Sequence, residues 1–291
     1  MLGNVLYINC LDQAAVLADV MGDTDKAESY RETAATAREA WNEFFIDPDT
    51  GKTKNIKGEI QDTQASYATP LRFHVVSDEN LENVLENYNA TIAEASGEDS
   101  DGMPIVPYTL TTGFNATGNL LNALSDYGLN DTAYKLFEST DYASWLYPVT
   151  QGATSIWERW NGYTNELGFN GNNSMNSFNH YSLGAVYEWM VAYQLGIKSD
   201  ETQPGYQHFI LQPTVGGDFT EAKGSYDSVY GTIKSGWTAA DGVMTSYDVT
   251  VPANTSATLC LPVSGEVTAC DGVTVPWERQ CSRQLPQGCT R

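Results

Sequence analysis

The sequence predicts a mainly α-helical protein that ends in an all-β domain, with an aromatic-rich site close to the junction. Three observations predict this organisation. Apolar residues recur at helical spacing from about residue 5 to 197, they alternate along strands after about residue 205, and four of the seven tryptophans lie between residues 145 and 193. A chain of 291 residues with 41% hydrophobic content can bury one large domain or two smaller ones.

The N-terminal part is predicted to be a series of amphipathic helices with short connections. In residues 27–44, for example, apolar side chains recur at steps of three and four. Because successive helices with short connections pack as antiparallel hairpins, many hairpins can close into a toroid that carries its site on the loops at one end. The expected helices cover residues 11–21, 27–44, 64–75, 81–95, 113–127, 131–138 and 177–195.

After Gly196 the periodicity changes from helix to strand. Alternating apolar residues on both sides of the Asp241-Gly242 turn signal predict an antiparallel β-sandwich or barrel, a typical small accessory domain. The last residues carry Arg and Cys without any alternation and predict an irregular tail. We therefore expect a helical domain over residues 1–200, a β-sandwich over 201–265 and a tail over 266–291.

The charge balance excludes two classes of partner. With 15 basic and 37 acidic residues, the net charge of -22 repels phosphate backbones and anionic lipid headgroups, so neither nucleic acid nor membrane is an expected partner. No apolar run approaches the roughly 20 residues that cross a bilayer, and no signal-peptide pattern is recognisable at the N-terminus. These observations leave the cellular compartment open.

The cysteines and histidines predict no metal site and no cofactor. None of the five cysteines forms a Cys-x-x-Cys pair, and the three histidines lie far apart in the sequence. The odd number of cysteines and their spacing also show no recognisable disulfide framework.

The residues that carry chemistry lie in two short blocks. Glu158 lies between Trp157 and Trp160, and Asn179 and His180 follow about twenty residues later. Aromatic rings offer flat faces to the C–H side of a pyranose, while carboxylate, amide and imidazole groups bind its hydroxyls. This combination predicts a carbohydrate site with one catalytic carboxylate.

The sequence spacing alone also allows purely structural roles for these residues. Glu158 could form an ion pair with Arg159, and His180 could be a residue of an early helical turn that bonds a backbone carbonyl. Trp189 and Tyr193 lie along one helical stripe and are expected in the core.

Three further features have a structural interpretation. Asp62 is expected to cap the helix that follows it, Trp145 could be core or pocket wall, and the acidic residues 94–101 are expected to form a solvated loop.

Residues 152–160 and 175–181 resemble the C-terminal half of the α-L-rhamnosidases of glycoside hydrolase family 78, and the spacing between the two blocks also fits. The resemblance covers roughly residues 5–262. It implies an (α/α)6 barrel followed by a C-terminal β-sandwich. Shorter similar blocks lie at residues 62–68, 112–114, 144–147, 204–206 and 251–255.

The resemblance implies hydrolysis of a terminal α-L-rhamnosyl bond with inversion at the anomeric carbon, so the expected partner is an L-rhamnose-containing glycoside. Glu158 matches the general base of the family, and His180 matches a sugar-binding residue. Trp157 and Trp160 are then expected to line the pocket, with Asn179 as a further contact. Inverting enzymes of this kind use two carboxyl groups about 6.5–9.5 Å apart.

The sequence departs from the family in lacking the Asp- and Arg-rich segment that carries the general acid. Residues 1–9 already have the pattern of a barrel helix. We therefore expect an incomplete toroid that is nearly inactive alone and self-associates or is unstable through uncovered apolar flanks. The alternatives are a noncatalytic carbohydrate-binding protein and a degenerate gene fragment. A polysaccharide lyase, a further alternative, normally needs basic groups that are scarce around residues 179–181.

Overall fold

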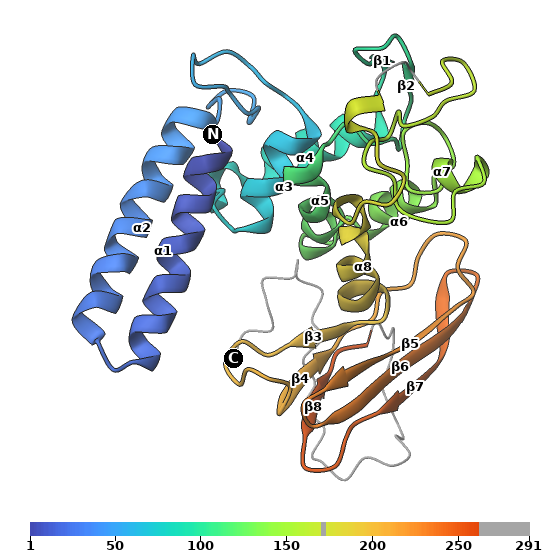
Figure 1. The fold of residues 1–291 in the computed structure, drawn as a ribbon. Helices are drawn as coiled ribbons and strands as arrows, with labels where there is room; N and C mark the ends of the chain where they lie inside the picture. The colour runs from blue at the N-terminus through green and yellow to red at the C-terminus, as the bar shows by residue number, and fades with distance from the viewer. Residues whose placement is uncertain (170–172, 262–291) are drawn as a thin grey trace. The chain divides into compact units, whose positions relative to one another are not determined.

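The computed structural model describes residues 1–169 and 173–261 (Figure 1). These residues divide into two units between Gly184 and Ala185. The expected tail over residues 266–291 lies outside the described residues.

The first unit is helical, and most of its helices begin and end within a few residues of the predicted positions. The first helix begins at Leu2 and not at residue 11, and the short helix Tyr147–Thr150 was not predicted. The helix that starts at Leu2 pairs with the next one as an antiparallel hairpin (Figure 1). The helices of this unit are α1 (Leu2–Val20), α2 (Thr24–Phe45), α3 (Gln64–Arg72), α4 (Asp78–Ala93), α5 (Phe114–Asp126), α6 (Asn130–Glu138) and α7 (Tyr147–Thr150).

The core of the first unit lies among α3, α4, α5 and α6. Tyr67, Tyr88 and Tyr134 are fully buried there together with Leu120 and Leu124. The hydroxyl of Tyr88 donates to the carbonyl of Leu120 at 2.8 Å, which satisfies a buried polar group inside an apolar core.

The α1 helix has an apolar face that the described residues leave uncovered. Leu17 and Val20 are 66% and 79% exposed, whereas Val5 and Ile8 are buried. The expected self-association is untested and stays a prediction.

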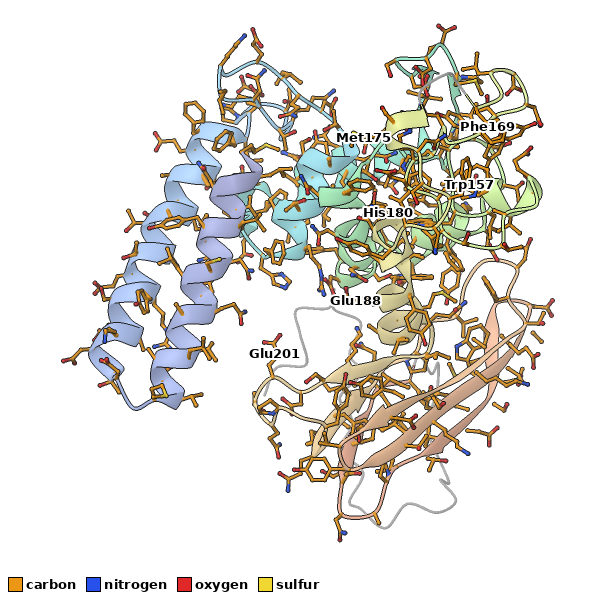
Figure 2. All side chains as sticks on the ribbon, viewed as in Figure 1. Trp157, Phe169, Met175, His180, Glu188 and Glu201 are labelled. Atoms are coloured by element: carbon orange, nitrogen blue, oxygen red, sulfur yellow. The ribbon has the colours of Figure 1, made fainter. Side chains whose placement is uncertain are left out.

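The segment between α6 and residue 182 contains little regular secondary structure. It includes α7 and the short 3-10 helix η1 (Asn173–Met175). Figure 2 shows Trp157, Phe169 and His180 on the loops of this segment and Met175 at the end of η1. Residues far apart along the segment pair through their backbones, because Glu158 N donates to Ser177 O at 2.9 Å and His180 N donates to Ile156 O at 2.8 Å.

That backbone pairing explains why the helix predicted over residues 177–195 begins later. The amides of Ser177 and His180 make long-range hydrogen bonds, to Glu158 Oε2 and Ile156 O, and residues 177–181 are not helical, so the prediction is wrong for them. The rest of the segment is helical, as predicted. It is made of η2 (Ser182–Ala185), α8 (Val186–Trp189) and the π-helical turn η3 (Met190–Gln194).

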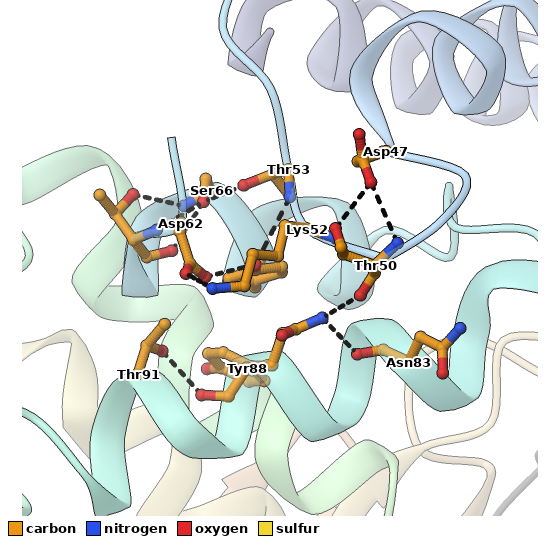
Figure 3. A network of polar contacts seen from close by, with 12 residues as sticks. Asp47, Thr50, Lys52, Thr53, Asp62, Ser66, Asn83, Tyr88 and Thr91 are labelled. Carbon is orange, nitrogen blue, oxygen red and sulfur yellow. Dashed lines mark hydrogen bonds and ion pairs between the residues drawn. The ribbon is translucent and has the colours of Figure 1, made fainter. Parts of the chain in front are cut away.

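The helix α3 starts at Gln64, as predicted, but its N-cap differs from the predicted one. Thr63, and not Asp62, is the N-cap, and it forms a capping box with Ser66. Asp62 has a φ of 42° and instead accepts hydrogen bonds from Tyr67 Oη at 2.6 Å and Lys52 Nζ at 2.5 Å. Burial, reinforced by Asp62, raises the pKa of Tyr67. Figure 3 shows how these contacts fasten the loop after α2 to α3.

The second unit has two three-stranded sheets, as the alternation predicts for a small β domain. Asp241 and Gly242 both have positive φ and form the predicted turn between β6 and β7. The pairing is antiparallel except between β4 and β8, which run parallel, a feature that alternation within one strand does not reveal. The sheets are β3 (Ile197–Ser199), β4 (His208–Leu211) and β8 (Ser256–Leu259), and β5 (Glu221–Ser228), β6 (Gly231–Ala240) and β7 (Val243–Thr250).

The core of the second unit forms between these strands and the end of the helix before them. Phe209 and Ile233 are fully buried in a cluster with Leu195. Trp189 and Tyr193, which the helical stripe assigned to the core, are 1% and 4% exposed, so that prediction is confirmed. In the part of the chain that the structure describes, every helix is too short or too polar to span a bilayer.

Candidate active site

A cavity of about 480 Å³ lies in the first unit, and Glu158 is one of the residues that line it. Its volume is within the range of small-molecule sites. The lining comes from three parts of the chain: the β1–β2 hairpin (Gly97–Glu98 and Pro104–Ile105), the segment that leads into α5, and the loops after α6. The lining residues are Asp99, Pro104, Ile105, Thr109, Leu110, Thr111, Thr112, Gly113, Phe114, Tyr142, Ala143, Glu158, Arg159, Trp160, Asn161 and Leu183.

A second cavity of about 340 Å³ has three tryptophans in its wall, and none of the described residues that line it is charged. Trp145, Trp157 and Trp160 contribute to its wall, and Trp160 also lines the first cavity. Trp160 is held by a hydrogen bond from its Nε1 to Thr112 O at 2.7 Å and by an edge-on contact with Trp145 at 5.9 Å. Trp145, for which the sequence left core and pocket open, is 8% exposed and lines this cavity as well.

Glu158 is held by one hydrogen bond and keeps one carboxylate oxygen free. Its Oε2 accepts from Ser177 N at 2.8 Å. Its Oε1 has no hydrogen-bond partner among the described residues, and no ion pair joins Glu158 to Arg159 within them. The simpler role of an ion pair with Arg159 is therefore absent, and the free oxygen remains available to a ligand.

Asp99 is a second carboxylate among the residues that line the cavity, and it was not predicted from the sequence. It lies in the acidic stretch that was expected to be a solvated loop, but its side chain is half-buried. Oδ2 accepts from Tyr142 Oη at 2.7 Å, and Oδ1 accepts from the amides of Asp101 and Met103, both at 2.9 Å. Burial raises the pKa of Asp99, but these hydrogen bonds outweigh burial and lower it.

The spacing of Asp99 and Gly102 could have given a hint, because Asp accepts from amides two and four residues later in tight turns. The distant donor, Tyr142, could not have been found from the sequence. Burial and the hydrogen bond to Asp99 raise the pKa of the Tyr142 hydroxyl. The pair is therefore an ionised carboxylate and a neutral phenol at neutral pH.

His180 lies before the helix and beside the cavity. Its ring stacks on Phe114, which lines the cavity, with centroids 4.9 Å apart and planes at 10°. The expectation of an early-turn helical residue is wrong, because residues 177–181 are not helical. His180 Nδ1 accepts from Ser182 N at 3.2 Å, which leaves Nε2 as the protonated nitrogen of the neutral ring.

The remaining predicted residues lie at different places. Trp157 is 6% exposed, packs edge-on against Phe178 at 5.1 Å and lines only the second of the two cavities. Asn179 is exposed and lines neither of the two cavities; its backbone amide donates to Ser177 Oγ at 3.2 Å. Of the five predicted site residues, Glu158 and Trp160 line the same cavity.

Comparison with known families decides the assignment of the chain. The sequence model of the bacterial α-L-rhamnosidase six-hairpin glycosidase domain matches residues 1–193. The chain belongs to this family. The bacterial α-L-rhamnosidase C-terminal domain matches residues 196–276.

Individual α-L-rhamnosidases are similar over most of the chain. An α-L-rhamnosidase of Formosa agariphila is 32% identical over 262 residues, which are 90% of this chain and 26% of that protein. The crystal structure of Streptomyces avermitilis α-L-rhamnosidase complexed with L-rhamnose has 32% identity and a TM-score of 0.75, over 88% of this chain and 22% of that one. The crystal structure of native α-L-rhamnosidase from Aspergillus terreus has 27% sequence identity and a TM-score of 0.74. The match covers 88% of this chain and 28% of that one.

The α-L-rhamnosidase assignment confirms the resemblance and the fold class predicted from the sequence: a helical part of the six-hairpin domain followed by a small β-sheet domain. The chain spans about a quarter of the length of the relatives it matches. The predicted domain boundary near residue 200 and the predicted roles of the site residues are not tested by these matches and stay predictions.

Proposed function

We propose that this chain carries the general base and part of the sugar pocket of an inverting α-L-rhamnosidase that acts on terminal non-reducing α-L-rhamnosyl residues of glycosides or polysaccharides. The observation that carries the proposal is the free Oε1 of Glu158 at a cavity of about 480 Å³. A general base needs an acceptor oxygen that no protein donor occupies, within reach of a bound water.

In this mechanism, a water oxygen attacks the anomeric carbon while Glu158 takes a proton from that water. The bond between the anomeric carbon and the glycosidic oxygen breaks with inversion, and the leaving oxygen receives a proton from a second carboxyl group. Asp99 is unsuited to be this general acid. Its lowered pKa keeps it ionised, and an ionised carboxylate has no proton to give.

Asp99 and Glu158 are the two carboxyl groups among the described lining residues of this cavity. We therefore infer that the proton for the leaving group comes from a residue outside that lining.

The aromatic residues around Glu158 would bind the apolar parts of the sugar. Trp160 and Phe114 line the same cavity as Glu158, and indole and phenyl faces suit the C–H side and the methyl group of a 6-deoxyhexose. His180 is positioned by its stacking on Phe114, and its Nε2 would donate to a sugar hydroxyl. Trp157 supports this segment from the neighbouring cavity, and Asn179 would contact the more exposed part of the substrate.

The test uses a substrate whose leaving group needs no protonation, 2,4-dinitrophenyl α-L-rhamnoside. With that substrate the rate depends on the base alone, so Glu158→Gln should lower it by about 10²–10⁴-fold. Glu166→Gln, in an exposed position of the same segment, makes the same change of charge and should leave the rate unaltered. Proton NMR of the first product should show β-L-rhamnose.

Two results would contradict the proposal: an unchanged rate in Glu158→Gln, or α-L-rhamnose as the first product. Binding of L-rhamnose without turnover of this activated substrate would instead favour a noncatalytic carbohydrate-binding role.

A further inference from the structure

Gln64, the first residue of α3, uses its side-chain amide to hold two backbone groups of the segment 109–114. Nε2 donates to Thr109 O at 2.8 Å and to Thr91 O at 3.3 Å, and Oε1 accepts from Thr111 N at 2.9 Å. Because both amide hydrogens are used and the residue is 1% exposed, Gln64 serves the protein and not a ligand.

The segment needs such partners because it has no regular secondary structure before α5. Residues 109–113 form neither helix nor strand, so their backbone N–H and C=O groups lack the hydrogen bonds that a helix or a sheet supplies. Thr109 and Thr112 are also 1% and 3% exposed, which leaves them little access to water. The side chain of Gln64 therefore fixes the segment where a neighbouring strand would otherwise do so.

The segment 109–114 forms one wall of the larger cavity and carries two of its aromatic contacts. All six of its residues line that cavity. Thr112 O accepts from Trp160 Nε1 at 2.7 Å, and the ring of Phe114 stacks on that of His180 with centroids 4.9 Å apart. A shift of the segment would therefore move the indole and the imidazole together.

We propose that Gln64 is a positioning residue for sugar binding, which holds the segment 109–114 so that the aromatic groups in contact with it are placed to bind the pyranose. This inference rests on the proposed function and extends it to a residue that does not line the cavity. Glu158 is held separately, by Ser177 N at 2.8 Å. Loss of the Gln64 contacts should therefore weaken sugar binding more than it slows proton transfer.

Asn42 in α2 makes the same kind of contact away from the cavity and provides the matched control. Nδ2 donates to Val75 O at 2.8 Å and Oδ1 accepts from Ser77 N at 2.9 Å, so the amide again bridges two residues that are two positions apart. Asn42 is 8% exposed, and these three residues are not part of the cavity lining. Loss of its contacts should destabilise the fold without reaching the sugar site.

The experiment compares Gln64→Met with Asn42→Leu, since each replaces a buried amide by an apolar side chain of similar size. Gln64→Met should raise KM for 2,4-dinitrophenyl α-L-rhamnoside about 3–10-fold, the size of one aromatic contact, and change kcat by less than about twofold. Asn42→Leu should leave both constants unaltered. Urea unfolding of the two variants checks that each is folded under the assay conditions.

The Nε1–H resonance of Trp160 gives a readout that does not depend on turnover, because this hydrogen is bonded to Thr112 O. The resonance is assigned by its loss in Trp160→Phe. It should shift in Gln64→Met and keep its position in Asn42→Leu.

Gln64→Glu is a milder second variant. Its carboxylate can still accept from Thr111 N, but it faces Thr109 O without a donor. It should also displace the Trp160 resonance, so the inference is tested even where Gln64→Met is too unstable to measure.

An unmoved Trp160 resonance and an unchanged KM in both Gln64 variants would overturn the inference, as would equal changes in Asn42→Leu. A wild-type chain that does not hydrolyse the rhamnoside would count against the proposed function, whereas the resonance would still decide the role of Gln64. The two failures are therefore distinguishable.

Discussion

The β1–β2 hairpin and the 157–160 segment each bring one carboxylate to the same cavity, but they hold it in different ways. Asp99, on the hairpin, accepts hydrogen bonds from Tyr142 and from two backbone amides. Glu158 accepts one, from the amide of Ser177. The comparison shows that position in a cavity does not make a carboxylate reactive. What matters is how many of its acceptor sites the protein itself has already used.

The difference follows from local backbone geometry. Asp99 opens a tight turn, so the amides two and four residues later point back at its short side chain. Glu158 lies in a bend whose backbone pairs with residue 177, and its side chain accepts from one amide, that of Ser177. The hairpin thus stabilises its own carboxylate, whereas the other segment leaves an oxygen for a ligand.

The largest expected effect is on the hydrolysis rate, and it distinguishes the two carboxylates. Glu158→Gln should lower the rate on the activated rhamnoside by about 10²–10⁴-fold, whereas Asp99→Asn should lower it by less than about tenfold, because its oxygens already serve the fold. Steady-state kinetics of both variants, with circular dichroism to check folding, measure this. An equal loss in the two variants would break the distinction drawn here.

Next in size is the stability that the aromatic residues give to the 157–160 segment. Trp157→Ala should lower the free energy of unfolding by about 3–5 kcal/mol, because the buried indole leaves a cavity. Met175→Ala, at a side chain that is 64% exposed in the same part of the unit, should change it by less than about 0.5 kcal/mol. Urea unfolding of both variants gives the difference, and similar values would mean that Trp157 is not packed as described.

A smaller effect is expected on the hairpin, where Tyr142→Phe removes one hydrogen bond to an ionised carboxylate. The loss should be about 1.5–3 kcal/mol near neutral pH. The folded-state pKa of Asp99 is lowered from its ordinary value of 3.8, so this stabilisation is present above that value and is lost as pH falls through the folded pKa. Urea unfolding at several acid pH values should show the wild type and the variant converging, and a constant gap would contradict the assignment.

The smallest effect concerns the indole shared by the two cavities. Trp160→Phe keeps an aromatic ring but removes the donor to Thr112 O, which should cost about 0.5–1.5 kcal/mol. Thermal unfolding of the variant measures it. A loss as large as that of Trp157→Ala would show that Trp160 is a packing residue first and a pocket residue second.

The fold was largely predictable because periodicity acts over short distances. Steps of three and four gave the helices from α2 to α6 within a few residues, and alternation with the Asp241-Gly242 signal gave the β6–β7 hairpin. One error, over residues 177–181, occurred where long-range backbone pairing replaces a helix, and another where two side chains compete for the same role. Thr63 caps α3 because Asp62, with its positive φ, is drawn toward Tyr67 and Lys52.

The candidate site was predictable only in part. The sequence, through its resemblance to a known family, singled out Glu158 and Trp160, which line one cavity. It missed the place of Asp99 and the contacts of Gln64, since their partners, Tyr142 and Thr109, lie 43 and 45 positions away along the chain.

The sequence alone determined where helices and strands form, because the spacing of apolar residues decides which face each element must bury. Only the tertiary structure decided which polar groups are satisfied and which are free. The contacts that decide this join Glu158 to Ser177, Tyr142 to Asp99 and Trp160 to Thr112, residues 19, 43 and 48 positions apart. No local pattern encodes them, since a hydrogen bond over such a separation exists only after the chain has packed.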